Sequence, residues 1–373
     1  MNEVFQASII FVVVFIVTFA MVPVSKRIAV KIGAIDYPSN RRVNIEPVPR
    51  CGGIALYTGI LAGFVVILLG GRFFQWDISS LYLIPGINYP LLFMGVTFMF
   101  AVGLVDDITQ LSAPFKLFGQ IGAAIIVVTA GVSISTLQFI SESIPIGLGW
   151  FDYPLTVLYL VIFVNVINLV DGLDGLAAGI VAIVSLSLLV LVIQRGNLSL
   201  AMVCVILIAV CAAFLRFNFF PASIFMGDSG SLLLGLSVGI ISITGIIRTQ
   251  SLVALLVPLV ISGIPIIDMV STIIRRMRGK KPVQESDLEH IHHRLLRAGM
   301  SQRRSVLLLY LCSGILAVSG VIIGYFSGVV RWIVFVALAI VVFAIIWRAG
   351  LFKPVLKHHY ENRGKRGPRA PRT

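Results

Sequence analysis

Four polar side chains follow one another at three-residue steps in a stretch that is otherwise apolar. The stretch NVINLVDGLDGLAAGI spans residues 165–180 and contains Asn165, Asn168, Asp171 and Asp174. Steps of this length place side chains along one face of a helix. A polar contact between two helices is the alternative interpretation, but such contacts favour neutral groups, and two ionisable acids exceed that need. The stripe therefore predicts a catalytic or binding site.

Two adjacent acids, Asp106 and Asp107, end another apolar run in the stretch GLVDDITQLSAPFKLFGQ. The C-terminal end of a helix already carries partial negative charge, so acids there are unfavourable unless a cation is nearby. Adjacent helical residues point about 100° apart. One acid could therefore hold a cation while the other accepts hydrogen bonds from the backbone or from Lys116. A helix end that is merely acidic is the alternative.

A third acidic motif, FMGDSGSL, leads into a later apolar run. Ser or Asp within residues 227–231 can cap a helix, and the free N–H groups at a helix N-terminus suit phosphate. An Asp beside an anion site is expected where a metal ion lies between them, which makes Asp228 a candidate metal ligand. Capping alone would account for only one of these residues.

Histidines and arginines complete the set of candidates. The stretch ESDLEHIHHRLLRAGM is expected to form a short amphipathic helix that carries His290, His292, His293 and Arg294. This pattern could bind zinc, but no Cys and no acids at ligand spacing accompany it, so contact with phosphate or sugar is favoured. Arg50 is a further candidate, because arginine binds phosphate through two hydrogen bonds. The alternative is that the arginines only contribute to the positive charge that orients a membrane protein.

The elements that must position these residues are membrane helices. Of the 373 residues, 58% are hydrophobic and only 12% are charged, about half the charged fraction of a soluble protein. The apolar runs approach the ~20 residues that cross a bilayer. We expect an all-α, polytopic integral membrane protein with about eleven transmembrane helices. The expected helices are 7–25, 53–70, 89–105, 115–134, 153–170, 176–194, 198–215, 230–247, 251–274, 305–327 and 331–348.

One catalytic membrane domain is expected over residues 1–348, with large inner loops at 26–52 and 275–304. The tail, residues 349–373, is basic, contains proline and lacks apolar periodicity, so it is expected to be disordered in the cytoplasm. The four cysteines form no CxxC pair and are interpreted as packing residues rather than as disulfide or metal sites.

The basic residues predict the orientation. The first apolar run is preceded by Glu3 and followed by Lys26 and Arg27, which fits a retained first helix with its N-terminus outside rather than a signal peptide. Of the 29 Lys and Arg residues, all but Arg72, Arg195, Arg248 and Arg331 then fall on the inner side. An odd number of helices places the C-terminus in the cytoplasm.

On this topology the acids share one depth near the inner leaflet. Five of them lie at cytoplasmic helix ends, and Asp268 lies seven residues before Arg275, about 10 Å into its span. A charged side chain at the centre of a membrane helix costs roughly 2.5–3.5 kcal/mol. Their retention therefore calls for a function. The acids are Asp106, Asp107, Asp171, Asp174, Asp228 and Asp268.

Four motifs together resemble the polyprenyl-phosphate N-acetylhexosamine-1-phosphate transferases. They are VDD at 105–107, NVINLVDGLDGL at 165–176, FMGDSGSL at 225–232 and HIHHRL at 290–295. The interrupted histidine run and the segment IPIID are similar to the GlcNAc branch of this family. The phospho-MurNAc-pentapeptide translocase branch is the alternative. One departure is Asn44, where the family usually carries His after the basic pair.

The resemblance implies transfer of GlcNAc-1-phosphate from UDP-GlcNAc to undecaprenyl phosphate, a polyprenyl phosphate, with release of UMP. This would be the first membrane step of a cell-envelope polysaccharide such as teichoic acid or O-antigen, in the bacterial inner membrane, with the site facing the cytoplasm. Membrane lipids are expected partners, a homodimer is an open option, and nucleic acid is not expected.

The same resemblance implies roles for the candidate residues. Mg²⁺, or alternatively Mn²⁺, would neutralise the charge of the phosphates. Its ligands would be Asp228 first, then Asp107 and Asp171, while Asp106 would position the lipid phosphate or act as a base. Asp174 is grouped with the catalytic acids. Phosphate, nucleotide or metal would be held by Arg50, Lys116, Asn165, Asn168, Asp268, His290, His292, His293 and Arg294.

Direct attack by the lipid phosphate is favoured, with a covalent aspartyl intermediate left open. We expect Asp228→Asn and Asp107→Asn to abolish transfer in protein that still inserts and purifies. An ion-coupled transporter is the rival from another class, but transporters bind near the membrane midplane. A CDP-alcohol phosphotransferase is disfavoured because DGLDGLAAGI lacks the arginine that follows the first Asp-Gly in that family.

Overall fold

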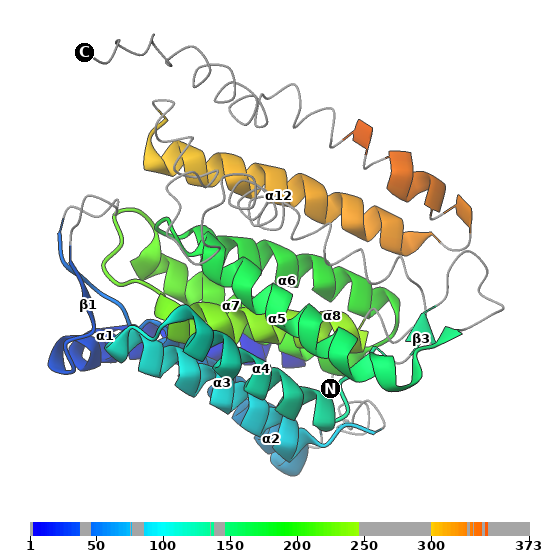
Figure 1. The fold of residues 1–373 in the computed structure, drawn as a ribbon, viewed down its shortest axis with the longest axis horizontal. Helices are drawn as coiled ribbons and strands as arrows, with labels where there is room; N and C mark the ends of the chain where they lie inside the picture. The colour runs from blue at the N-terminus through cyan, green and yellow to red at the C-terminus, as the bar shows by residue number, and fades with distance from the viewer. Residues whose placement is uncertain are drawn as a thin grey trace, which may run out of the picture.

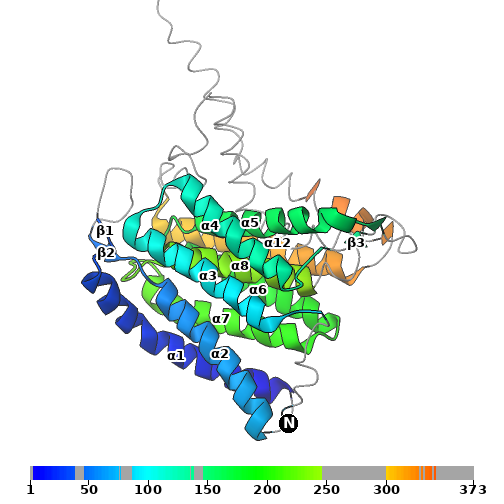
Figure 2. The same ribbon diagram turned by 60° about the horizontal axis from the view of Figure 1, so that its bottom comes forward.

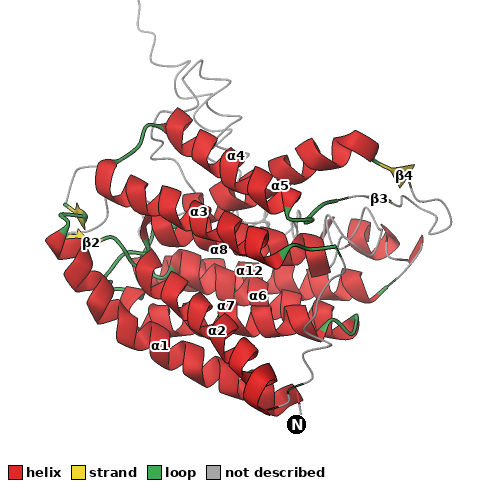
Figure 3. Cartoon of the chain, turned by 90° about the horizontal axis from the view of Figure 1, so that it is seen from below, coloured by secondary structure: helices red, strands yellow, loops and turns green. Residues whose placement is uncertain are grey.

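The computed structural model describes residues 3–37, 46–74, 76, 86–134, 136–137, 146–245, 300–326, 329–330, 332–337 and 340–341. This part of the chain is almost entirely helical (Figures 1 and 3). With the labels of Figure 1, the helices are α1 (Glu3–Lys31), α2 (Gly53–Phe74), α3 (Tyr89–Thr109), α4 (Ala113–Thr129), α5 (Asp152–Val170), α6 (Leu176–Gln194), α7 (Leu198–Asn218), α8 (Gly227–Gly245) and α12 (Gln302–Tyr325).

Eight helices of the described chain are long and apolar enough to cross a membrane, and they are all of these except α4, which has 17 residues. The prediction of a helical, multi-pass membrane protein is confirmed at this level. Nine of the expected helices are found near their predicted positions. The expected helix 251–274 lies outside the described residues, and 331–348 is described only in pieces.

Two small hairpins correct the expectation of a purely helical chain. Strand β1 (Ile35–Asp36) pairs antiparallel with β2 (Val48–Pro49), and β3 (Thr136–Leu137) pairs with β4 (Ile146–Gly147). A second correction concerns α1, which continues to Lys31 instead of ending near residue 25. Basic residues in a last turn interact favourably with the negative end of the helix dipole, so the helix extends beyond its apolar run.

Helix α8 forms the centre of the described bundle. Its residues from Gly227 to Gly245 are nearly all buried, and it packs on α3 and α5 (Figure 2). Around it, α12 packs on α6, α6 on α7, α7 on α1, and α1 on α2. The sequence of α8, GDSGSLLLGLSVGIISITG, is rich in small residues. Small residues let helix backbones approach closely in a membrane, which suits a helix that is enclosed on all sides.

Several helix ends meet at one end of this bundle. The helices α3 and α5 end there, while α2, α4 and α8 begin there, close to the β1–β2 hairpin. Contact is close enough that a Cβ at Gly103 of α3 would lie 2.5 Å from the carbonyl oxygen of Asp228. The polar residues of the predicted motifs occupy these helix ends, so the fold brings them together.

Candidate active site

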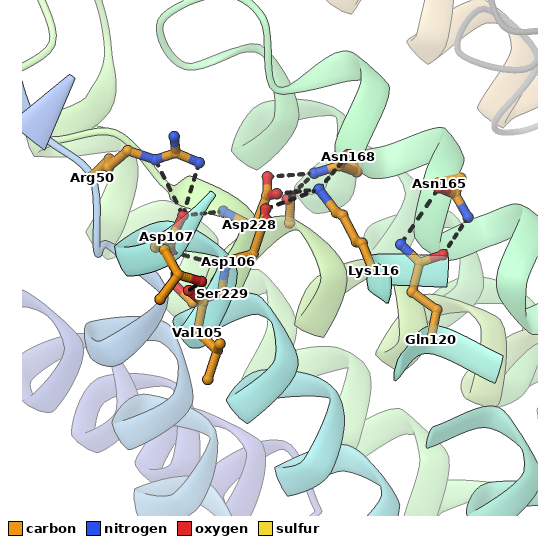
Figure 4. Close-up of polar contacts among 12 residues, drawn as sticks. Arg50, Val105, Asp106, Asp107, Lys116, Gln120, Asn165, Asn168, Asp228 and Ser229 are labelled. Carbon is orange, nitrogen blue, oxygen red and sulfur yellow. Dashed lines mark hydrogen bonds and ion pairs between the residues drawn. The ribbon is translucent and has the colours of Figure 1, made fainter. Parts of the chain in front are cut away.

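The carboxylate of Asp107 caps helix α8, although it comes from α3. Its Oδ1 accepts the backbone N–H of Asp228 at 2.7 Å, and its Oδ2 accepts the N–H and the hydroxyl of Ser229 at 3.1 and 2.5 Å (Figure 4). Gly227 makes room for this contact: it has φ +70°, and a Cβ there would lie 2.5 Å from Oδ2 of Asp107. A carboxylate at a helix N-terminus pairs free N–H groups and opposes the positive end of the dipole.

Arg50 completes the shell of Asp107. Its Nη2 and Nε donate to Oδ1 of Asp107 at 3.1 and 3.3 Å. The backbone places Arg50 there, because the N–H of Phe225 donates to the carbonyl of Pro49 at 2.8 Å and the N–H of Gly52 donates to the carbonyl of Phe225 at 3.0 Å. The segment before α2 thus pairs with the segment before α8.

These contacts bear on the predicted role of Asp107 as a metal ligand. Five donor contacts from Arg50, Asp228 and Ser229 fall on its two oxygens, while a carboxylate offers about four lone-pair positions. Asp107 would therefore have to release a donor before it could bind a metal ion. The geometry gives Asp107 a positioning role, and its metal role stays a prediction.

A second cluster surrounds the ammonium group of Lys116 on α4. Its Nζ forms an ion pair with Oδ2 of Asp228, lies 3.3 Å from Oδ2 of Asp106, and lies 3.4 Å from Oδ1 of Asn168 (Figure 4). Asn168 also donates to Oδ1 of Asp228 at 2.8 Å and to the hydroxyl of Ser231 at 2.9 Å. Three oxygens from three helices therefore face one positively charged atom.

The donor atoms of this cluster show whether the residues present could bind a divalent cation. Among the residues that the structure describes, no three Asp, Glu, His or Cys side chains are close enough together to hold a metal ion. Mg²⁺, however, is usually held by one or two carboxylates, with water and substrate phosphates as its other ligands. Asp228 and Asp106, with the amide oxygen of Asn168, supply such a donor set, and the Lys116 ammonium already stands among them as a cation. The residues present fit Mg²⁺.

The polar stripe of residues 165–174 does not continue as one helix. Helix α5 ends at Val170, as the expected helix 153–170 does. Asp171 and Asp174 therefore lie in the following turn and do not share the helix face predicted for all four residues. The carboxylate of Asp171 makes no hydrogen bond to another described side chain or backbone group. Burial raises the pKa of Asp171 well above its usual value, and the negative charges of Asp228 and Asp107 raise it further. A nearby cation would stabilise its ionised form.

Asp174 contacts the backbone of another loop. Its Oδ2 accepts the N–H of Ala222 at 2.9 Å, which joins the turn after α5 to the loop between α7 and α8. Asn218 makes a second connection, because it accepts the N–H of Gly175 at 3.0 Å and donates to the carbonyl of Ile224 at 2.9 Å. The predicted catalytic role of Asp174 stays a prediction, and its observed contact holds two site loops together.

Asn165 pairs with Gln120 of α4 (Figure 4), and its predicted role in binding substrate or metal stays a prediction. Gln120 and Asn218 are not among the site residues predicted from the sequence. A signal for Gln120 was available, since it follows Lys116 by four residues on an apolar helix and so lies on the same face. No comparable local signal marks Asn218.

Five predicted site residues lie outside the described part of the chain, so their roles stay predictions. They are Asp268, His290, His292, His293 and Arg294.

Comparison with known proteins gives consistent results. The model of glycosyl transferase family 4 matches residues 89–246. A protein of Bacillus subtilis (strain 168), named "Probable undecaprenyl-phosphate N-acetylglucosaminyl 1-phosphate transferase", is 37% identical over 315 residues, which cover 84% of each chain. The decaprenyl-phosphate N-acetylglucosaminephosphotransferase of Mycolicibacterium smegmatis is 34% identical over 78% of this chain and 75% of its own. The undecaprenyl-phosphate alpha-N-acetylglucosaminyl 1-phosphate transferase of Escherichia coli (strain K12) is 28% identical over 94% of this chain and 95% of its own.

Proposed function

The chain belongs to glycosyl transferase family 4, and we propose on this premise that it transfers GlcNAc-1-phosphate from UDP-GlcNAc to undecaprenyl phosphate and releases UMP. The observation that carries the proposal is the cluster of Asp106, Asp228, Lys116 and Asn168 at one end of a bundle of membrane-length helices. A polyprenyl acceptor stays in the bilayer while a nucleotide sugar arrives from water, so the reaction requires a polar site at a membrane surface.

The chemical difficulty is charge repulsion. A phosphate monoester has a second pKa near 6 and is largely a dianion at neutral pH, yet it must approach the diphosphate of the donor. Two unit charges 4 Å apart repel by about 4 kcal/mol at an effective dielectric constant of 20. Lys116 and Arg50 supply positive charge at this place from two different segments. Mg²⁺ held by Asp228, with Asp106, Asn168 and Asp171 as candidate further donors, would add charge neutralisation when bound.

Direct attack by the lipid phosphate is the proposed course, because this phosphate is already a nucleophile. The contacts of the carboxylates support it. Asp107 receives donors on both oxygens, and Asp228 is engaged by Lys116 and Asn168. These contacts lower the nucleophilicity of both carboxylates. Incubation with UDP-GlcNAc alone, followed by mass spectrometry, tests this point: a phosphorylated or glycosyl-phosphorylated enzyme would contradict direct attack.

The site is proposed to face the cytoplasm of a bacterial plasma membrane, with the N-terminus of the chain outside. Basic residues support this orientation. Lys31 and Arg216 lie in the last turns of α1 and α7, at the end of the bundle that carries Lys116 and Arg50. Arg72 lies at the opposite end, in the last turn of α2. Cytoplasmic loops of membrane proteins carry the excess of Lys and Arg.

The test is a transfer assay with purified protein and undecaprenyl phosphate. UDP-GlcNAc, UDP-GalNAc and UDP-MurNAc-pentapeptide are compared as donors, each with and without EDTA, and UMP release is measured. We expect release with UDP-GlcNAc, and loss of release in EDTA that excess Mg²⁺ restores. Release only from UDP-MurNAc-pentapeptide would assign the chain to the translocase reaction, and release unaffected by EDTA would contradict the metal role. Uptake of substrate into proteoliposomes without UMP would indicate a transporter.

A further inference from the structure

A pair of amides, one buried and one partly buried, lies next to the site and has no role in the chemistry proposed above. Nδ2 of Asn165 on α5 donates to Oε1 of Gln120 on α4 at 2.7 Å, and Nε2 of Gln120 lies 3.5 Å from Oδ1 of Asn165. Asn165 also donates to the carbonyl of Val161 at 2.8 Å. Gln120 is 1% exposed. Neither amide contacts Asp228, and Figure 4 shows the pair beside the carboxylate cluster rather than within it.

The pair is one helical turn away from a second polar contact between the same helices. Lys116 precedes Gln120 by four residues on α4, and Asn168 follows Asn165 by three residues on α5. Residues at these spacings lie on one helix face. The second contact joins Nζ of Lys116 to Oδ1 of Asn168 at 3.4 Å. Helices α4 and α5 are therefore connected at two successive levels, and the outer level belongs to the site.

The first two turns of α4, which carry Lys116, have no buried apolar side chain, because the buried apolar residues of this helix, Ala123, Ala124, Val127 and Val128, lie further along it. Phe115 and Phe118 are 70% and 71% exposed, and Leu117 is 43% exposed. No side-chain hydrogen bond caps the helix at Ser112. Apolar contacts in a membrane resist sliding weakly, because lipid chains offer a similar environment, whereas hydrogen bonds between helices are directional. The Gln120–Asn165 pair is such a directional contact.

We propose that Gln120 is a positioning residue that acts through Lys116. Its amide, paired with Asn165, fixes α4 against α5 so that the Lys116 ammonium lies among Asp228, Asp106 and Asn168. The inference rests on the proposed function, because it assigns Lys116 a part in transfer. It also gives Asn165 a role that differs from the substrate or metal contact predicted from the sequence.

The experiment measures kcat, KM and thermal stability with radiolabelled UDP-GlcNAc and undecaprenyl phosphate. Gln120→Met removes the amide and keeps an unbranched side chain of similar size. We expect kcat to fall about 10- to 100-fold, the range found when a group that orients a site ligand is lost. The matched control is Tyr159→Phe, which removes another buried hydrogen bond of α5, the 3.1 Å contact with Ser242 on α8. The control should keep the wild-type kcat, and Gln120→Met should lose no more stability than the control does.

Two further variants separate positioning from general loss of structure. The exchanged pair Gln120→Asn with Asn165→Gln retains both amides and should recover kcat to within about threefold of wild type. Lys116→Ala alone should lower transfer about 10²- to 10³-fold, as loss of one preorganised donor does. In that background Gln120→Met should change the residual rate by less than about twofold, because groups that act through one another are not additive.

Three results would each overturn the inference while transfer by the wild type still stands. They are a wild-type kcat in Gln120→Met, an equal loss from Gln120→Met in the Lys116→Ala background, and no recovery of kcat in the exchanged pair. If Gln120→Met does not purify, Asn165→Ala must show the same loss and the same dependence on Lys116, and its failure to do so overturns the inference. Absence of UMP release by the wild-type protein would overturn the proposed function, and the inference with it.

Discussion

Replacement of Asp107 by Asn should lower the free energy of unfolding much more than the same replacement at the neighbouring Asp106. The carboxylate of Asp107 receives the N–H groups of Asp228 and Ser229, the Ser229 hydroxyl and the Arg50 guanidinium. An Asn can keep the acceptor oxygen, but its NH2 group would then face the N–H of Ser229. One helix cap and one ion pair are weakened by a change of one atom.

The magnitude follows from these contacts. Loss of a helix cap costs about 1 kcal/mol, and a buried charge left without its partner costs about 3–5 kcal/mol. The Arg50 side chain is only 17% exposed, so most of the second cost applies. Because the two effects overlap, we expect a total of about 3–5 kcal/mol. Asp106→Asn should cost about 1 kcal/mol, since Lys116 keeps its ion pair with Asp228.

The assay heats detergent-purified wild type, Asp106→Asn and Asp107→Asn in EDTA and measures the fraction that stays monodisperse. EDTA removes any contribution from bound metal, so that only the contacts within the chain are compared. The sequence alone predicts that Asp107→Asn purifies normally, whereas the contacts of Asp107 predict a loss of stability. Equal stability of the two variants would contradict a stabilising role of Asp107 at the N-terminus of α8. Asp107 would then remain a candidate metal ligand.

Three further predictions follow from the same contacts. Asp228→Asn should lower UMP release by at least about 10³-fold in protein that still purifies, and a smaller loss would contradict its central role. Gly103→Ala should destabilise the bundle because its Cβ would lie 2.5 Å from the Asp228 carbonyl. Gly314→Ala on α12 should not, because its Cβ would meet no described atom within 4 Å apart from its own helix backbone and chain neighbours; equal melting temperatures would contradict the close packing of α3 and α8. Burial raises the pKa of Asp174 above its ordinary value of 3.8. The wild-type free energy of unfolding therefore decreases as the pH rises from this ordinary value through the folded pKa, because the buried carboxyl must ionise. Asp174→Asn, which stays neutral, should therefore gain in melting temperature relative to wild type as the pH rises above about 4, and a pH-independent difference would argue against a buried carboxyl.

Local sequence was sufficient for the helices. An apolar run of about 20 residues must form its backbone hydrogen bonds within itself in a membrane, so α6 at 176–194 is found where the run predicts it. Charged residues at the end of an apolar run did not define the end of the helix. The run before Lys26 predicted an end near residue 25, but α1 continues to Lys31, because basic residues are compatible with both a last helical turn and a loop. The identity of the polar motifs was also readable, since acids within apolar runs are expensive and therefore conspicuous.

The sequence by itself thus determined the class of the protein and the approximate positions of the nine expected helices that the structure describes, and it supplied the candidate residues for the chemistry. Tertiary structure decided which partner each polar side chain has. Asp107 caps a helix by accepting the N–H of a residue 121 positions later, and Asn165 meets an amide 45 residues earlier. Spacing along a helix fixes only which residues share a face. The partner of a side chain depends on which helix packs against that face, and this depends on the whole bundle.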